Sequence, residues 1–255
     1  MKLGLDEYAY LTSPIHSWEP RAKLIGLLVL IFAFATVQSL WLIPLMMAVT
    51  VALLWLSRLP FSYVRNRLKV PGIFILFLAI MLPFVSGDTI LVQVGPLALR
   101  LEGTQAMVLI ASRFVCILTV SLILFGTAPF LSTIKALRGM GLPSILADMI
   151  LLTYRYLFEL AEMLATMRTA IRMRGFDGSK LNRRMLGTLA SLIGSMLVRS
   201  YEQAEQVYKA MILRGYGSGS LSPGEFHTSP LDWLKSALAV GTACLLVIMQ
   251  VWSNL

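Results

Sequence analysis

This sequence has little charge, only two cysteines and two histidines, and no Gly-Lys pair anywhere along its length. Charged residues make up 14% and hydrophobic residues 57% of its 255 positions, whereas soluble domains average about 25% charged and about 45–50% apolar. The composition therefore predicts an all-α integral membrane protein. Because a P-loop requires a lysine directly after a glycine, the missing pair excludes this kind of ATPase site.

The scarcity of reactive side chains also argues against an enzyme or a metal site. Cys116 and Cys244 both lie in apolar runs, so we expect small buried hydrophobes and not a disulfide. His16 and His227 are far apart, and no Cys/His spacing fits a transition-metal site. Neither a nucleophile-elbow nor a His-Glu-x-x-His motif occurs. We expect no catalytic activity and no metal or cofactor bound by this chain.

The net charge of +9 comes from basic residues that lie beside apolar segments. Arg21 and Lys23 precede the first apolar run, and a basic segment, 58–69, follows the second. This placement is typical of cytoplasmic loops under the positive-inside rule. We therefore expect these charges to face the lipid bilayer of a cell inner or plasma membrane. We do not expect the chain to bind nucleic acid.

Several segments are apolar enough to cross a membrane, a task that takes about 20 residues in a helix. A membrane domain over 1–128 would hold four spans, and 231–255 the last, which predicts about five spans in total: 24–40, 41–56, 71–85, 103–126 and 231–251. The third contains two prolines and a glycine, so it is expected to be kinked or broken.

The order of the charged segments predicts the topology. We interpret 58–69 as a cytoplasmic loop, which places the N-terminus in the cytoplasm and, with an odd number of spans, the C-terminus outside. Residues 87–102 alternate in polarity around Gly95-Pro96 and predict a short β-hairpin on the outer face.

Residues 129–230 form the charged region of the chain, with 12 Lys or Arg against 7 Asp or Glu. We expect a cytoplasmic coupling region with two long helices, at 144–174 and about 181–214. Each helix would end in the same pattern, Arg174-Gly175-Phe176 and Arg214-Gly215-Tyr216, at an offset of 40 residues.

Each Arg-Gly ending has a simple structural explanation. Glycine adopts the left-handed conformation that closes a helix, and an arginine in the last turn complements the helix dipole. For a single copy this capping explanation is sufficient. Two copies at equal offset, each followed by an aromatic residue, instead favour a pair of anchors for partner subunits, with Arg172 as a neighbouring positive charge in the first copy.

Six stretches of the sequence resemble the transmembrane T component of energy-coupling-factor transporters, the CbiQ/EcfT family. Besides the two Arg-Gly endings they are Ser-Pro-Ile-His-Ser-Trp-Glu-Pro-Arg-Ala-Lys at 13–23, Thr-Ala-Pro at 127–129, Ala-Leu-Arg-Gly-Met-Gly-Leu-Pro at 136–143 and Leu-Thr-Tyr-Arg-Tyr at 152–156. The N-terminal stretch is more similar to the cobalt and nickel branch than to the branch shared among vitamins.

The resemblance implies a complex of this scaffold with two ATPase subunits, which bind MgATP, and a separate substrate-binding membrane subunit, the S component. It also implies that Arg174 and Arg214 dock in grooves of the two ATPases. The family motif is usually Ala-Arg-Gly, whereas this chain has Met173 and Leu213 before the arginines. That departure leaves the arginines themselves intact.

Other candidates are less specific. Arg113 lies within the fourth span, where a charge is either functional or snorkels to the interface. Tyr154, Arg155 and Tyr156 either orient the first long helix against the membrane domain or form an interfacial aromatic belt. A self-contained secondary transporter or channel that uses Arg113 and the third span is the alternative function, but no inverted repeat supports it.

Overall fold

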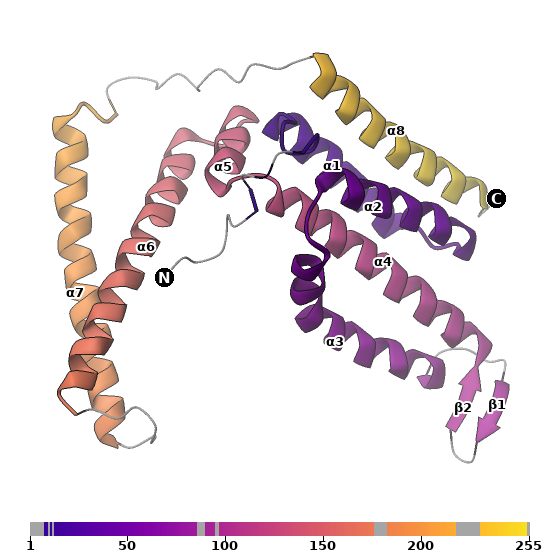
Figure 1. Cartoon of the computed structure of the whole chain (residues 1–255), viewed down its shortest axis with the longest axis horizontal. Helices are drawn as coiled ribbons and strands as arrows, with labels where there is room; N and C mark the ends of the chain where they lie inside the picture. Colours follow the sequence, from indigo (N-terminus) through magenta and orange to yellow (C-terminus); the bar gives the residue numbers. More distant parts are fainter. Residues whose placement is uncertain are drawn as a thin grey trace. The chain divides into compact units, whose positions relative to one another are not determined.

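The structure is a computed structural model that describes residues 8–9, 11, 13–85, 90–94, 97–175, 183–217 and 230–253. These residues are predominantly helical (Figure 1). The chain divides into two compact units, one built mainly from residues 5–140 and 225–255 and the other mainly from residues 141–224.

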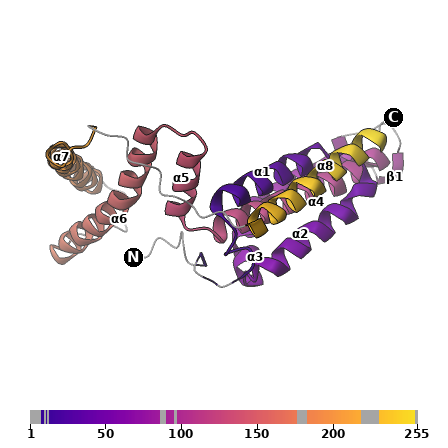
Figure 2. The same cartoon turned by 90° about the horizontal axis from the view of Figure 1, so that it is seen from above.

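The first unit is a bundle of helices. In it α4 contacts α1, α2 and α3, while α8 packs along α1 (Figures 1 and 2). The helices are α1 (Pro20–Thr36), the 3-10 helix η1 (Leu40–Leu42), α2 (Ile43–Ser57), α3 (Phe61–Val85), α4 (Leu101–Gly126), α5 (Phe130–Gly139) and α8 (Pro230–Ser253).

The bundle buries an apolar core and leaves other large apolar side chains exposed. Leu27, Phe34 and Val120 are completely buried between α1 and α4. Trp41 and Trp55, in contrast, are 91% and 80% exposed. Indole rings at the ends of an apolar helix suit the membrane–water interface, so these outward side chains fit a protein embedded in lipid.

Three helical segments in the described part of the chain are long and apolar enough to cross a membrane: Leu40–Ser57, Leu101–Gly126 and Pro230–Ser253. The expected all-helical membrane fold is confirmed in this respect. Helix α1 has 17 residues, which is about 25 Å at roughly 1.5 Å per residue and short of the hydrocarbon thickness of about 30 Å. The total of five spans therefore stays a prediction.

The basic segment after the second span is not the loop that the sequence suggested. Helix α3 begins at Phe61 and runs without interruption past Pro71 to Val85. Arginine, leucine and lysine favour helix, and no helix breaker lies between Phe61 and Val70. The basic residues from Arg65 to Lys69 therefore belong to the first half of α3.

Two short strands lie in the segment that was expected to form a hairpin. Strand β1 (Ile90–Val94) pairs antiparallel with β2 (Leu97–Arg100), and Val94 lies opposite Leu97. The turn residues between them are outside the described part of the chain.

A buried glutamine holds the corner between α1 and α2. The side-chain oxygen of Gln250, on α8, accepts hydrogen bonds from the backbone amides of Gln38 and Ser39 at 2.9 and 3.1 Å and from the Ser39 hydroxyl at 2.9 Å. Gln250 is only 5% exposed. Because no water in lipid can replace these bonds, one side chain of α8 satisfies the backbone where the chain reverses.

The second unit contains two long helices, α6 (Ser144–Met173) and α7 (Arg183–Leu213), whose bounds match the two helices expected from the sequence. Near their middle, Gln203 donates to the Glu159 carboxylate at 2.7 Å. Beyond the end of α7, the Tyr216 hydroxyl donates to the Asp148 carboxylate, near the start of α6, at 3.1 Å. The helices are therefore antiparallel and cross each other (Figure 1).

We expect Gln250→Leu to destabilise the first unit, because the amides of Gln38 and Ser39 would lose their acceptor. An unsatisfied buried group costs about 1–3 kcal/mol, so the thermal unfolding temperature of the purified protein in detergent should fall clearly. Gln105→Leu is the matched control, since Gln105 is exposed on α4. Equal unfolding temperatures for the two variants would contradict the role of Gln250.

Candidate functional site

The two Arg-Gly endings share one backbone geometry. Gly175 and Gly215 have φ angles of +78° and +80°, a region that favours glycine. The Gly175 amide donates to the Arg172 carbonyl at 3.0 Å, and the Gly215 amide donates to the Ile212 carbonyl at 2.9 Å. These bonds place Arg174 and Arg214 at the same position of their helices, the C-cap.

The ending of α7 is a complete Schellman motif. In addition to the bond of Gly215, the Tyr216 amide donates to the Met211 carbonyl at 3.0 Å. This pair of bonds satisfies carbonyls that a helix end would otherwise leave unpaired. The residue equivalent to Tyr216 at the end of α6, Phe176, is a predicted site residue that lies outside the described part of the chain.

The arginine side chains of both endings are accessible. Arg172, Arg174 and Arg214 are exposed, and the guanidinium groups of Arg174 and Arg214 make no hydrogen bond or ion pair with any described residue. Met173 and Leu213, which directly precede the two C-cap arginines, are 84% and 88% exposed. Each ending thus offers a charged fork beside an apolar side chain, a combination that suits a binding anchor.

The antiparallel arrangement separates the two endings. Helix α6 has 30 residues and α7 has 31, so each is about 45 Å long at roughly 1.5 Å per residue. Because each ending lies at the C-terminus of its own helix, Arg174 and Arg214 lie at opposite ends of the crossed pair. The structure thus brings each arginine together with its glycine but keeps the two endings apart.

Tyr216 has a contact within the chain. It is 38% exposed, and its hydroxyl is the group that donates to Asp148. The ring therefore lies near the start of α6, and the residue stays partly exposed.

The aromatic cluster of α6 is built from local contacts. The rings of Tyr154 and Phe158 meet edge to face with centroids 5.0 Å apart. The Arg155 guanidinium lies 5.8 Å from the centroid of the Tyr156 ring. Tyr154 and Tyr156 are half-buried and Arg155 is exposed, so these contacts stiffen the helix and leave the arginine available.

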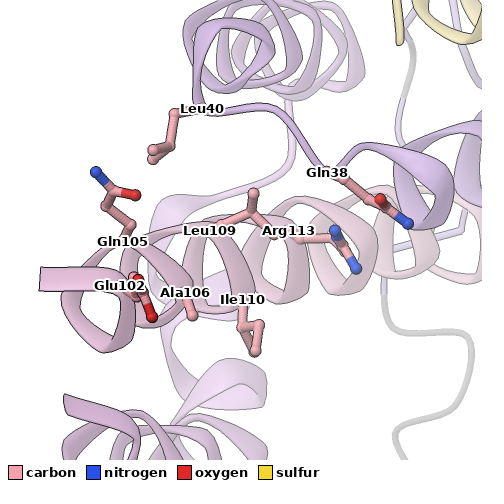
Figure 3. Close-up of a pocket in the computed structure, with 8 residues that line it drawn as sticks. All are labelled: Gln38, Leu40, Glu102, Gln105, Ala106, Leu109, Ile110 and Arg113. Atoms are coloured by element: carbon pink, nitrogen blue, oxygen red, sulfur yellow. The ribbon is translucent and has the colours of Figure 1, made fainter. Parts of the chain in front are cut away.

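Arg113 lines a cavity of about 410 Å³ on α4, together with Gln38, Glu102 and Gln105 (Figure 3). Its guanidinium donates to the Val37 carbonyl, next to the corner held by Gln250. Arg113 therefore satisfies a backbone carbonyl at the end of α1, which is a structural role for an intramembrane charge.

Sequence reasoning missed the role of Lys23, which we interpreted as a charge flanking the first span. Lys23 is 1% exposed, and its ammonium donates to the carbonyls of Ile15 at 3.0 Å and Thr127 at 3.1 Å. It joins the N-terminal segment to the corner between α4 and α5. The one indication of this role in the sequence was that Lys23 belongs to the 13–23 stretch that resembles the family.

A comparison with protein-family models identifies the chain. The model described as "CbiQ: Cobalt transport protein" matches residues 12–224, which is most of the chain. This chain belongs to the CbiQ family. It is a transmembrane T component of energy-coupling-factor transporters, as the resemblance of its motifs indicated.

Similar proteins carry two kinds of name. The energy-coupling factor transporter transmembrane protein EcfT of Heliobacterium modesticaldum is 28% identical and covers 99% of this chain and 98% of its own length. EcfT of Streptococcus equi is 26% identical and covers 94% of this chain and 92% of its own length. The cobalt transport protein CbiQ of Rhodobacter capsulatus is 32% identical over about half of each chain, 50% and 52%.

We expect Gly175→Ala to loosen the last turn of α6 in this CbiQ-family protein. Nothing lies within 4 Å of the added methyl group, so the effect comes from the positive φ alone, which costs about 1–2 kcal/mol. Amide hydrogen exchange over residues 170–174 should become about tenfold faster.

Gly187→Ala is the control for this measurement. Gly187 lies inside α7 with open space around it, and alanine favours a helix interior over glycine. Amide hydrogen exchange of α7 in Gly187→Ala should slow or stay unchanged. Unaltered exchange at the end of α6 in Gly175→Ala would show that Gly175 is not needed for this cap.

Proposed function

We propose that this T component relays ATP-driven motion from two ATPase subunits to a substrate-binding S component in the membrane. The observation that carries the proposal is the pair of exposed Arg-Gly endings, which share one cap geometry and lie at opposite ends of an antiparallel helix pair. MgATP binds to the partner subunits and not to this chain, which has no P-loop and carries out no catalysis.

The distance between the endings supports two receptors. A single groove cannot hold two arginines that are separated by about the length of a 30-residue helix, roughly 45 Å. Two antiparallel helices of nearly equal length are related by an approximate two-fold axis. That symmetry suits a pair of ATPase subunits that present the same groove twice.

The chemistry of each ending supports an anchor. Arg174 and Arg214 supply planar sets of N–H donors for carboxylate or carbonyl groups of the ATPases. Gly175 and Gly215 close the helices directly behind them, so that the arginines leave the helix in a fixed direction. We assign contacts that support these anchors to Arg172, Phe176 and Tyr216.

Coupling requires that the ATPase pair hold the endings differently in its nucleotide states. A ligand shifts an equilibrium only by its different affinity for the two states. In this proposal, closure of the ATPases on MgATP changes the position of the endings, and α6 and α7 transmit the change to the S component. Tyr154, Arg155 and Tyr156 orient α6 against the membrane part of the complex.

We expect Arg174→Ala and Arg214→Ala each to weaken ATPase binding by about 2 kcal/mol or more, the effect of an anchor residue. That is roughly a 30-fold loss of affinity. Binding of the purified ATPase pair to the chain in nanodiscs, measured by biolayer interferometry, reports it directly. Arg174→Lys and Arg214→Lys should also bind more weakly, since lysine lacks the planar fork.

Arg199→Ala is the matched control, because Arg199 is exposed on α7 away from its end. It should bind the ATPases like the unaltered chain. Equal affinity of all the alanine variants would remove the anchor role from both arginines. Transport by the purified chain alone in liposomes would instead favour the self-contained transporter or channel.

We also propose a cargo and a topology. The description of the family model and the name of the Rhodobacter capsulatus relative favour cobalt ions as the cargo. Nickel ions are the other candidate, because the N-terminal stretch resembles the cobalt and nickel branch of the family. The basic residues favour a multi-pass chain with a cytoplasmic N-terminus, cytoplasmic α6 and α7, and an external C-terminus. Uptake of radioactive cobalt or nickel that is lost on deletion of the chain, without loss of vitamin uptake, tests the cargo.

A further inference from the structure

A polar cavity of about 280 Å³ lies in the first unit, away from the Arg-Gly endings. It opens where the N-terminal segment, the corner between α4 and α5, and the first turn of α8 meet. The lining residues used below are Trp18, Glu19, Lys23, Thr127, Ser132 and Asp232. None of them belongs to the coupling site.

Two buried polar atoms on the wall of this cavity have no partner. Glu19 is 6% exposed, and its Oε1 accepts no hydrogen bond from any described residue. Trp18 is 5% exposed, and its indole N–H likewise has no acceptor. Because buried polar groups in folded proteins are nearly always paired, an unmatched acceptor and an unmatched donor in one cavity indicate a ligand that both donates and accepts.

The wall carries two buried carboxylates, of which Glu19 has an oxygen without a partner among the described residues. Asp232 is also buried, and its carboxylate oxygen lies 3.6 Å from the Lys235 ammonium. Burial raises the pKa of the Glu19 carboxyl, Arg21 lowers it, and Asp232 raises it. The nearby Lys23 ammonium donates to two carbonyls and forms no ion pair with Glu19. A bound positive charge would relieve the repulsion between the two carboxylates.

The described side chains favour an ammonium group over a metal ion. His16 also lines the cavity, but its Nε2 donates to the Tyr8 carbonyl at 2.9 Å and its Nδ1 lies 2.6 Å from the Ser13 hydroxyl, so both ring nitrogens are engaged. Among the described residues, no three His, Cys, Asp or Glu side chains are placed to hold a metal. A cation with N–H donors fits two carboxylates better.

The cavity lies beside the ends of two apolar helices. Thr127 directly follows the end of α4, and Asp232 lies in the first turn of α8. Both helices are long and apolar enough to cross a membrane. Residues at the ends of two such helices mark the zone in which phospholipid headgroups lie.

We propose that this cavity binds the phosphoethanolamine headgroup of a membrane phospholipid. The primary ammonium lies between the carboxylates of Glu19 and Asp232. The phosphodiester accepts hydrogen bonds from the indole N–H of Trp18 and the hydroxyl of Ser132. The bound lipid thereby satisfies both unpartnered atoms and joins the N-terminal segment to the α4–α5 corner and to α8.

The test compares two lipids that differ only in the methylation of the ammonium. The full chain is reconstituted in nanodiscs with equal amounts of phosphatidylethanolamine and phosphatidylcholine, extracted in mild detergent, and its retained lipid is counted by mass spectrometry. We expect about tenfold preference for phosphatidylethanolamine, the value of a charge-assisted hydrogen bond that choline cannot make. Equal retention of the two lipids overturns the proposal, whatever the variants do.

Variants then locate the site. Glu19→Gln removes the negative charge, and Trp18→Phe removes only the indole N–H donor. Glu19→Gln should reduce the preference to near onefold. Trp18→Phe should lower the retention of both lipids and leave their ratio unchanged, because both carry the phosphodiester. Glu102→Gln, the same exchange at the cavity of Arg113, should change neither the ratio nor the retention. A preference that survives in Glu19→Gln, or a lipid retention that is unchanged in Trp18→Phe, places the lipid elsewhere and overturns the assignment.

A last arm distinguishes the lipid from a free metabolite. Soluble phosphoethanolamine is added to the chain in nanodiscs that contain only phosphatidylcholine, and binding is measured by calorimetry. Weak binding, far below the affinity for the lipid, supports the phospholipid as the source. Saturation at micromolar concentration shows that the cavity serves a soluble ligand and overturns the lipid assignment.

Discussion

The interaction on which the first unit depends is the satisfaction of backbone groups by buried polar side chains at the two ends of α1. At one end, the Lys23 ammonium donates to the carbonyls of Ile15 and Thr127. At the other, Gln250 accepts from the amides of Gln38 and Ser39. In lipid an unpaired backbone group is costly, so these side chains make irregular corners tolerable between apolar helices. They also connect α1 to α4 and α8, which are distant in sequence.

The second unit follows a different principle. Helices α6 and α7 bury little of their surface against each other, and Ala147 and Leu192 are its buried residues among those described. What defines their arrangement is the polar contact of Gln203 with Glu159 and of Tyr216 with Asp148. A pair with so much exposed apolar surface is suited to contacts with other subunits.

The sequence predicted most of this architecture because its signals are local. Apolar runs and helix-ending glycines indicated the long helices, and the offset of 40 residues indicated two equivalent endings. The basic segment at 58–69 was interpreted wrongly as a loop, since charge was given more weight than helix propensity. Lys23 and Gln250 could not be understood from the sequence, because their partners are fixed only by packing of α1 against α4 and α8. The same is true of the cavity beside Glu19.

The bond between Tyr216 and Asp148 ties the ending of α7 to the start of α6. The helix pair is therefore closed on the side of Arg214. A force on Arg214 would act on both helices, because this hydrogen bond connects them. At the end of α6, the described residues next to Arg174 make no equivalent hydrogen bond to α7. If the ATPases bind the two endings as proposed, equal displacements of Arg174 and Arg214 would act on helix ends that are held differently, so a symmetric movement of the ATPases would tilt the helix pair.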